Sequence, residues 1–180
     1  MSLYDEIPGR LMLALSKFND LSDSEATAEL LKCCGSRAWA NRLDAERPFA
    51  SFEDLLNKAT EIWWKLDRHD WLEAFRSHPK IGEKKTATEI SAQSQKWSGQ
   101  EQRGLESSSQ ETLDELATLN REYEQKFGYI FIVCATGKSS TEMLALLRSR
   151  LTNDTETELP IAAGEQAKIT EIRLRKLLSQ

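Results

Sequence analysis

Phe75-Arg-Ser-His78-Pro79-Lys-Ile-Gly82 is the stretch where an apolar, helix-like pattern gives way to a polar one. Proline disfavours the α conformation for the residue before it, so a helix that contains Phe75 should end by His78. The imidazole is then expected at a helix end. An imidazole can exchange a proton near neutral pH, and a carboxylate that faces it across a loop would complete the minimum equipment for proton transfer.

A second polar group, Ser98-Gly-Gln-Glu101-Gln102, follows the polar residues 82–97. Its S-x-x-E spacing predicts a capping box, in which Ser98 begins a helix that runs to Phe127 with a break near residues 107–109. This structural role does not exclude binding, because a helix N-terminus presents unpaired amides to an anion. Residues 82–97 are expected to form a surface loop, which is either a plain connection or a lid.

The composition suits one domain that covers residues 1–180 and lies in the cytoplasm. A chain of 180 residues can bury a core without metal or disulfide staples. The net charge of -5 argues against nucleic-acid and membrane-surface partners. No apolar run is long enough for a membrane span, and no signal segment is evident. Cys33, Cys34 and Cys134 form no disulfide framework, so buried, reduced thiols are expected.

Apolar residues recur at helical spacing along most of the chain, which predicts an all-α protein. Helices are expected over residues 3–19, 22–35, 39–43, 51–66, 70–78, 98–127, 140–151 and from 161 onward, with a polar connection over 152–160. The exception is the continuously apolar, strand-like run 129–135. Because a lone strand has no neighbour, its amides and carbonyls need other partners, and a bound ligand is one candidate.

Arg173 lies four residues from both Ile169 and Leu177, so it shares their apolar helix face. A guanidinium directed inward needs an anion, either a protein carboxylate or a ligand, and the spacing leaves both open. The chain's two histidines, His69 and His78, occur in no metal-binding motif, so no metal site is expected. His69 stands between acidic and basic neighbours and is expected to be a solvated helix-end residue.

Four motifs in this order resemble the 2-oxo-4-hydroxy-4-carboxy-5-ureidoimidazoline (OHCU) decarboxylases of urate breakdown, in their bacterial form. They are the opening stretch, Ser98-Gly-Gln-Glu101-Gln102, Asn120-Arg-Glu-Tyr-Glu-Gln-Lys-Phe-Gly-Tyr-Ile-Phe-Ile-Val-Cys-Ala135 and Glu171-Ile-Arg-Leu174. The resemblance covers almost the whole chain. It implies an all-α, compact multi-helix domain with one extended ligand-binding segment at about residues 129–135.

The resemblance also implies a homodimeric enzyme that needs no cofactor and converts OHCU to (S)-allantoin and CO2. By motif match, the catalytic proton donor falls on His78, with Glu101 as its acidic partner. The residues implied to contact the substrate, together with Glu101, are Pro79, Ser98, Gly99, Gln100, Gln102, Phe131, Ile132, Val133, Cys134, Ala135 and Arg173. The alternative is a catalytically silent helical module that binds a ureide or purine-derived ligand in the same pocket.

Overall fold

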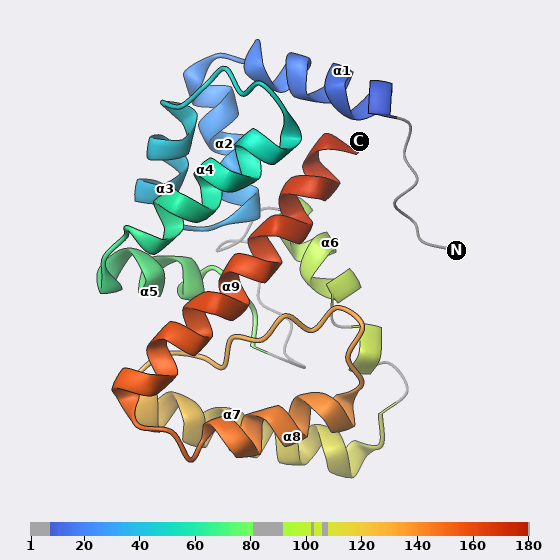
Figure 1. The fold of residues 1–180 in the computed structure, drawn as a ribbon. Coiled ribbons are helices and arrows are strands. Elements are labelled where there is room, and N and C mark those ends of the chain that lie inside the picture. Colours follow the sequence, from blue (N-terminus) through green and yellow to red (C-terminus); the bar gives the residue numbers. More distant parts are fainter. Residues whose placement is uncertain (1–7, 81–91, 102, 106–107, 180) are drawn as a thin grey trace.

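The computed structural model describes residues 8–80, 92–101, 103–105 and 108–179 (Figure 1). These residues form helices and no strand, which confirms the all-α prediction. The helices are α1 (Pro8–Asn19), α2 (Asp23–Cys33), α3 (Arg37–Asp44), α4 (Phe52–Trp64), α5 (Arg68–Arg76), α6 (Ala92–Glu101), the 3-10 turn η1 (Arg103–Leu105), α7 (Gln110–Phe127), α8 (Ser140–Arg150) and α9 (Thr155–Leu178).

The long helix α9 connects the two ends of the molecule (Figure 1). Helices α1 to α4 lie at one end, and the packed pair α7 and α8 lies at the other. Helix α9 starts beside α8 and packs against α1, α2, α4 and α5 on its way to the C-terminus. Between α7 and α8 the chain runs as an extended segment. The four motifs quoted above lie on different elements: at the end of α5, in α6, across α7 and the extended segment, and in α9.

Two buried indoles join helices through hydrogen bonds, one of them between α4 and α9 and the other between α3 and α4. The Nε1 of Trp63 on α4 donates to the backbone oxygen of Ala163 on α9, at 3.0 Å. The Nε1 of Trp39 on α3 donates to the backbone oxygen of Ala59 on α4, also at 3.0 Å. Each ring buries a large apolar surface while its N–H keeps a partner, so neither burial leaves an unsatisfied donor.

Polar caps set most helix starts. In each case the cap side chain accepts a hydrogen bond from the backbone amide three residues further on, and the caps are Ser22, Ser36, Ser51, Asp67, Ser109, Ser139 and Asp154. The predicted starts at Ser22 and Ser51 are confirmed. Gly128 ends α7 with a φ of 80°, a left-handed conformation that glycine adopts without strain, and this end was also predicted.

The capping role predicted for Ser98 is wrong. Ser98 and Glu101 lie in the last turn of α6, and the helix that reaches Phe127 begins at Gln110 behind its cap Ser109. The S-x-x-E spacing places both side chains on one buried face, where they contact another helix instead of their own amides. Ser98 therefore presents no helix N-terminus to an anion. Of the predicted loop, residues 82–91 lie outside the described residues, and its last part is helical.

The last helix starts earlier than predicted. Asp154 caps it, and Pro160 lies inside its second turn rather than before its start. Glu158 and Leu159, both buried, precede this proline, so tertiary packing of the first turn outweighs the backbone donor that Pro160 lacks.

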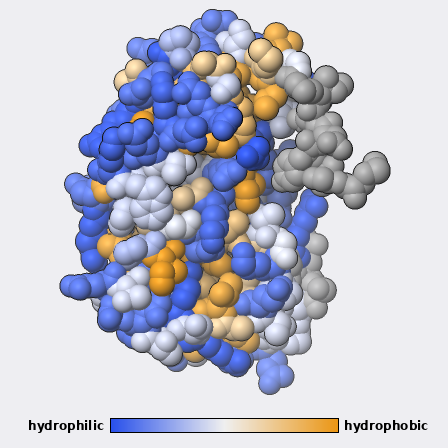
Figure 2. Space-filling model, in the orientation of Figure 1, coloured by the Kyte–Doolittle hydropathy of each residue, from blue (hydrophilic) through white to orange (hydrophobic). Residues whose placement is uncertain are grey.

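Within the described ranges, no helix has the length and hydropathy needed to cross a membrane. On the face shown in Figure 2, hydrophobic residues form small groups separated by hydrophilic ones. Among the residues whose burial the structure describes, the large hydrophobic ones with exposed side chains are Met12, Leu13, Trp64, Leu146 and Ile161.

Candidate active site

A pocket forms where the end of α5, the last turn of α6, the extended segment and α9 meet. It encloses about 370 Å³ of space not filled by atoms, part of it open to solvent. Its lining residues come from the first three motifs quoted above and, in one case, from α9 just before the fourth motif. They are His78, Pro79, Ser98, Glu101, Phe131, Ile132, Val133, Ala135 and Ile169. Mixed apolar walls with a few convergent polar groups are typical of small-molecule sites.

The remaining predicted substrate contacts lie around this pocket in different ways. Gly99 and Gln100 are exposed and do not line it. Cys134 is buried and lies between lining residues without lining the pocket itself. Arg173 lies behind Glu101, and Gln102 is outside the described residues.

His78 is held at the end of α5, as the proline rule predicts. Helix α5 ends at Arg76, and the His78 amide donates to the Phe75 oxygen at 3.1 Å. The imidazole is buried, with 7% of the residue exposed, and its Nε2 lies 2.7 Å from Oε1 of Gln166 on α9. A backbone turn and a side-chain hydrogen bond therefore both fix the ring.

Gly35, which follows the C-terminal end of α2, packs closely against Ser77, the residue before His78. A Cβ atom on Gly35 would stand 2.3 Å from the Cβ of Ser77. We expect Gly35→Ala to lower the free energy of unfolding by about 1–3 kcal/mol, because the backbone of one segment must move. It should also lower turnover by displacing His78. Urea unfolding and a turnover assay measure the two effects.

Gly164→Ala is the matched control for Gly35→Ala. The contact of a Cβ at Gly164 would be Trp64 at 4.0 Å, an ordinary van der Waals distance. Because Gly164 lies inside α9, alanine there should raise stability by about 0.5–1 kcal/mol. Equal effects from the two substitutions would show that the Gly35–Ser77 approach does not constrain the fold.

Glu101 and Arg173 form a buried, bidentate ion pair. The Arg173 Nε donates to Glu101 Oε1 at 3.0 Å, and Nη2 donates to Oε2 at 2.9 Å. The same Nη2 donates to the Ser98 hydroxyl at 3.0 Å. Lys176 lies 3.8 Å from Glu101, and burial lowers the pKa of its ammonium despite that carboxylate. Of the two anions that the sequence left open for Arg173, the protein supplies a carboxylate.

The extended segment obtains its backbone partners from charged side chains. Arg150 Nη1 donates to the Ile132 oxygen at 2.6 Å. The Cys134 amide donates to Glu165 Oε2 at 2.7 Å, and Lys138 Nζ donates to the Cys134 oxygen at 2.6 Å. These contacts give partners to the backbone of Ile132 and Cys134 in a segment that has no neighbouring strand.

The backbone groups of Phe131 and Val133 lie on the opposite edge of the same segment. Successive residues of an extended chain direct their backbone groups to opposite sides, so Phe131 and Val133 alternate with the residues that are held. Among the described residues, none forms a hydrogen bond with the backbone of Phe131 or Val133. Both residues line the pocket. Their N–H and C=O groups can therefore serve a ligand.

A buried polar cluster stands behind Ile132. Glu158, which is 0% exposed, accepts from Arg150 Nε at 2.7 Å, from Asn153 Nδ2 at 2.7 Å and from the Tyr123 hydroxyl. Burial raises the pKa of the Tyr123 hydroxyl, so this group stays a neutral donor. The cluster joins α7, α8 and α9 to the extended segment and so determines where one pocket wall lies.

The thiols are not suited to nucleophilic catalysis. All three cysteines are free and buried, as predicted. Cys134 is the cysteine whose sequence neighbours, Val133 and Ala135, line the pocket. Burial raises the pKa of its thiol, so the thiol remains protonated.

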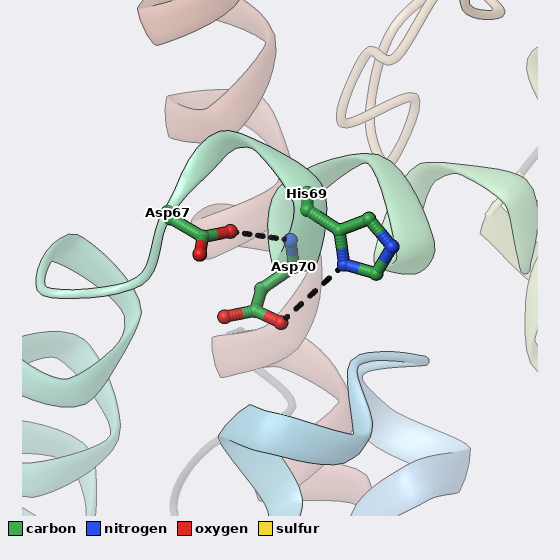
Figure 3. A group of neighbouring side chains, drawn as sticks. All are labelled: Asp67, His69 and Asp70. Carbon is green, nitrogen blue, oxygen red and sulfur yellow. Dashed lines mark hydrogen bonds and ion pairs between the residues drawn. The ribbon is translucent and has the colours of Figure 1, made fainter.

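Asp67, His69 and Asp70 form a second group of polar side chains at the start of α5 (Figure 3). Their ligand-type atoms lie within 4.8 Å of one another. Asp67 accepts from the Asp70 amide at 3.1 Å, and His69 Nδ1 lies 3.9 Å from Asp70 Oδ1 (Figure 3). The His69 side chain is 81% exposed, and none of the three lines the pocket. The geometry is that of a helix N-cap.

Comparison with known proteins adds to this geometry. The family model for OHCU decarboxylase matches residues 19–175. The chain belongs to the OHCU decarboxylase family.

Relatives and a solved structure of this family agree in sequence and fold. The uric acid degradation bifunctional protein of Arabidopsis thaliana is 39% identical over 82% of this chain and 45% of its own length. The mouse OHCU decarboxylase is 33% identical over 74% of this chain and 75% of its own length. A crystal structure of an OHCU decarboxylase in the presence of (S)-allantoin matches with a TM-score of 0.73 and 37% identity, covering 89% of this chain and 100% of the other.

The chain spans less than half the length of the bifunctional relatives it matches, 45% of the Arabidopsis protein and 33% of one from Bacillus.

Two residues of this OHCU decarboxylase-family pocket were missed by the sequence reasoning. Gln166 contacts His78, and Ile169 lines the pocket. They lie seven and four residues before Arg173, so all three share one face of α9. The spacing that identified Arg173 as inward could have identified Gln166 as well, because a polar residue on a buried face needs a partner.

Proposed function

We propose that this chain decarboxylates OHCU to (S)-allantoin and CO2 in the pocket between His78 and the extended segment. The observation that carries the proposal is the convergence on one pocket of His78, Glu101 and four residues of the extended segment, Phe131, Ile132, Val133 and Ala135. Family membership supports the substrate class. A site with one imidazole, one paired carboxylate and a backbone edge fits a small polar ring better than a long or strongly charged ligand.

The substrate can carry the electron pair that decarboxylation releases. When the bond between C4 and the carboxyl group breaks, CO2 leaves and the pair moves into the adjacent C=N bond of the ring. C5 must then receive a proton, and the C4 hydroxyl must lose one to become a carbonyl. The ring nitrogen takes up one further proton from solvent. The protein's part is to orient the ring and move protons.

His78 is assigned the proton transfer. It lines the pocket, its ring is fixed by α5 and Gln166, and an imidazole can both accept and donate a proton near neutral pH. The uncatalysed intermediate is planar at C5 and would be protonated on both faces. A single, fixed proton donor reaches one face only, which accounts for a product of one hand.

Glu101, together with Arg173, is assigned the orientation of the C4 substituents. Arg173 holds the Glu101 carboxylate with two hydrogen bonds, and Glu101 lines the pocket, where its carboxylate can accept a hydrogen bond from the substrate hydroxyl. The backbone groups of Phe131 and Val133 supply partners for the ring amide and ureido groups.

Glu101→Gln should lower turnover by about ten- to a hundredfold, the equivalent of one charge-assisted hydrogen bond of about 1.5–3 kcal/mol. The amide keeps the shape of the side chain but removes the charge that orients Arg173 and the hydroxyl. Turnover is measured at a temperature where the variant is shown to be folded. Glu171→Gln is the control. The Glu171 side chain is 52% exposed, and it pairs with Arg175, which also lies on α9. A Glu101→Gln enzyme as active as Glu171→Gln would reduce Glu101 to a structural residue.

The proposed activity is tested by adding the purified chain to freshly generated OHCU and following circular dichroism and CO2. We expect optical activity to develop as CO2 is released, because spontaneous decay yields racemic allantoin. Tight, stoichiometric binding of OHCU without faster CO2 release would instead support a silent module that binds a ureide or purine-derived ligand.

We also propose, on the family resemblance, that residues 1–180 form one domain that assembles as a homodimer in the cytoplasm. Light scattering should then give about twice the chain mass of 20.5 kDa. A mass of one chain under assay conditions would refute the dimer.

A further inference from the structure

A chain of three hydrogen bonds leads from the His78 imidazole into α9. His78 Nε2 and Gln166 Oε1 are 2.7 Å apart. Gln166 Nε2 donates to the Thr170 hydroxyl at 3.1 Å, and that hydroxyl donates to the backbone oxygen of Gln166 at 3.0 Å. Gln166 is 0% exposed and Thr170 is 7% exposed, so water does not compete for these groups.

The chain of bonds has a direction. A hydroxyl has one hydrogen, and Thr170 gives it to a backbone carbonyl, so its oxygen accepts from the Gln166 amide nitrogen. The amide oxygen is therefore the atom directed at His78. A carbonyl oxygen can only accept, so the proton of this contact belongs to His78 Nε2.

We propose that Gln166 is a positioning residue that holds His78 as the Nε2–H tautomer, so that protons enter and leave the imidazole through Nδ1. The tautomer is a property of the protein without substrate. Its consequence for turnover rests on the proposed function: Nδ1 takes the proton of the C4 hydroxyl as C4 becomes a carbonyl, and the imidazolium returns that proton to C5. Throughout both steps, Nε2 keeps its proton and its bond to Gln166.

The direct test uses the chain labelled with ¹⁵N-histidine and a two-bond ¹H–¹⁵N correlation spectrum, recorded above the titration of both imidazoles. The chain has only two histidines, so His69→Gln assigns the signals of His78. We expect the pattern of an Nε2–H imidazole for His78. The pattern of an Nδ1–H imidazole would overturn the proposal, whether or not the enzyme decarboxylates OHCU.

Thr170→Val is the variant that separates positioning from packing. Valine keeps the shape of threonine and removes the hydroxyl that orients the amide, so Gln166 can rotate and His78 should show a mixture of the two tautomers. Thr170→Ser, which restores the hydroxyl, should restore the Nε2–H pattern. If Thr170→Val keeps the pure Nε2–H pattern, the hydroxyl does not set the orientation and the proposed chain of bonds is wrong.

Gln166→Met provides the kinetic readout. Methionine fills the site but cannot accept from Nε2, so kcat should fall while KM is retained, because Gln166 acts on His78 and not on the substrate. The charged groups beside the imidazole in the pocket, Glu101 with its partner Arg173, are unchanged in this variant. A change confined to KM would contradict the positioning role. The positioning role would also be contradicted if the variant lost activity while the His78 spectrum stayed normal and kcat followed thermal stability alone.

Discussion

Replacing His78 by Asn should lower kcat by about a hundredfold to ten-thousandfold, the range typical for removal of a general acid or base. Asparagine can keep a hydrogen bond to Gln166 but has no group that titrates near neutral pH. The fold should survive, because the backbone turn that ends α5 does not involve the ring. The measurement is circular dichroism of (S)-allantoin formation from freshly generated OHCU.

His69→Asn is the matched control for His78→Asn. It removes the other histidine of the chain, whose side chain is 81% exposed at the start of α5 and outside the pocket. Its turnover should equal that of the unaltered chain. If the His78 variant also formed (S)-allantoin at the unaltered rate, the assignment of proton transfer to His78 would be wrong.

Arg150→Met should lower the free energy of unfolding by about 3–5 kcal/mol, the usual cost of leaving a buried charge without its partner. Glu158 would keep the Tyr123 and Asn153 hydrogen bonds but lose its cation. The Ile132 carbonyl would lose its donor as well, so the pocket wall should loosen and turnover should fall further than stability alone explains. Guanidinium unfolding gives the stability, and the OHCU assay gives the turnover.

Arg148→Met tests whether this effect belongs to the buried cluster. Arg148 lies on the same helix, but its side chain is 58% exposed and pairs with Glu115 at the surface. Exposed pairs contribute about 0–1 kcal/mol, so this variant should remain close to the unaltered chain. Comparable losses in the two variants would mean that the cluster behind Ile132 is no more important than a surface ion pair.

Local rules predicted much of the fold because they depend on neighbours in the sequence. The caps Ser22 and Ser51 and the left-handed Gly128 each act within one turn, so their residue types suffice. The inward direction of Arg173 follows from helical spacing in the same way. Its side chain is 3% exposed, whereas that of Arg175, two residues further on, is 43% exposed.

Long-range contacts decided where these rules failed. The S-x-x-E spacing is the same whether Ser98 begins a helix or lies at the end of one, and only Arg173, 75 residues away, distinguishes the two. Pro160 is a helix breaker by sequence, yet burial of Glu158 against Arg150 carries the helix through it. The side chains that hold the extended segment were likewise not predicted, because neither the donor Arg150 nor the acceptor Glu165 carries a local signal that it contacts a backbone.

The motifs predicted most of the residues that line the pocket. They did not predict Gln166, which contacts His78 from α9. The motifs placed His78, Glu101 and the extended segment in one candidate site, and the structure brings them to one pocket. Gln166 was missed because a glutamine on an amphipathic helix reads as a surface residue until its face is known to be buried.

The most direct measurement is a crystal structure of this chain soaked with (S)-allantoin. The account predicts the ligand in the pocket beside His78, with hydrogen bonds from its ring amide or ureido group to the backbone of Phe131 or Val133 and a polar contact to Glu101. Allantoin bound at a place that includes neither His78 nor the extended segment, in crystals of a chain that decarboxylates OHCU, would contradict it.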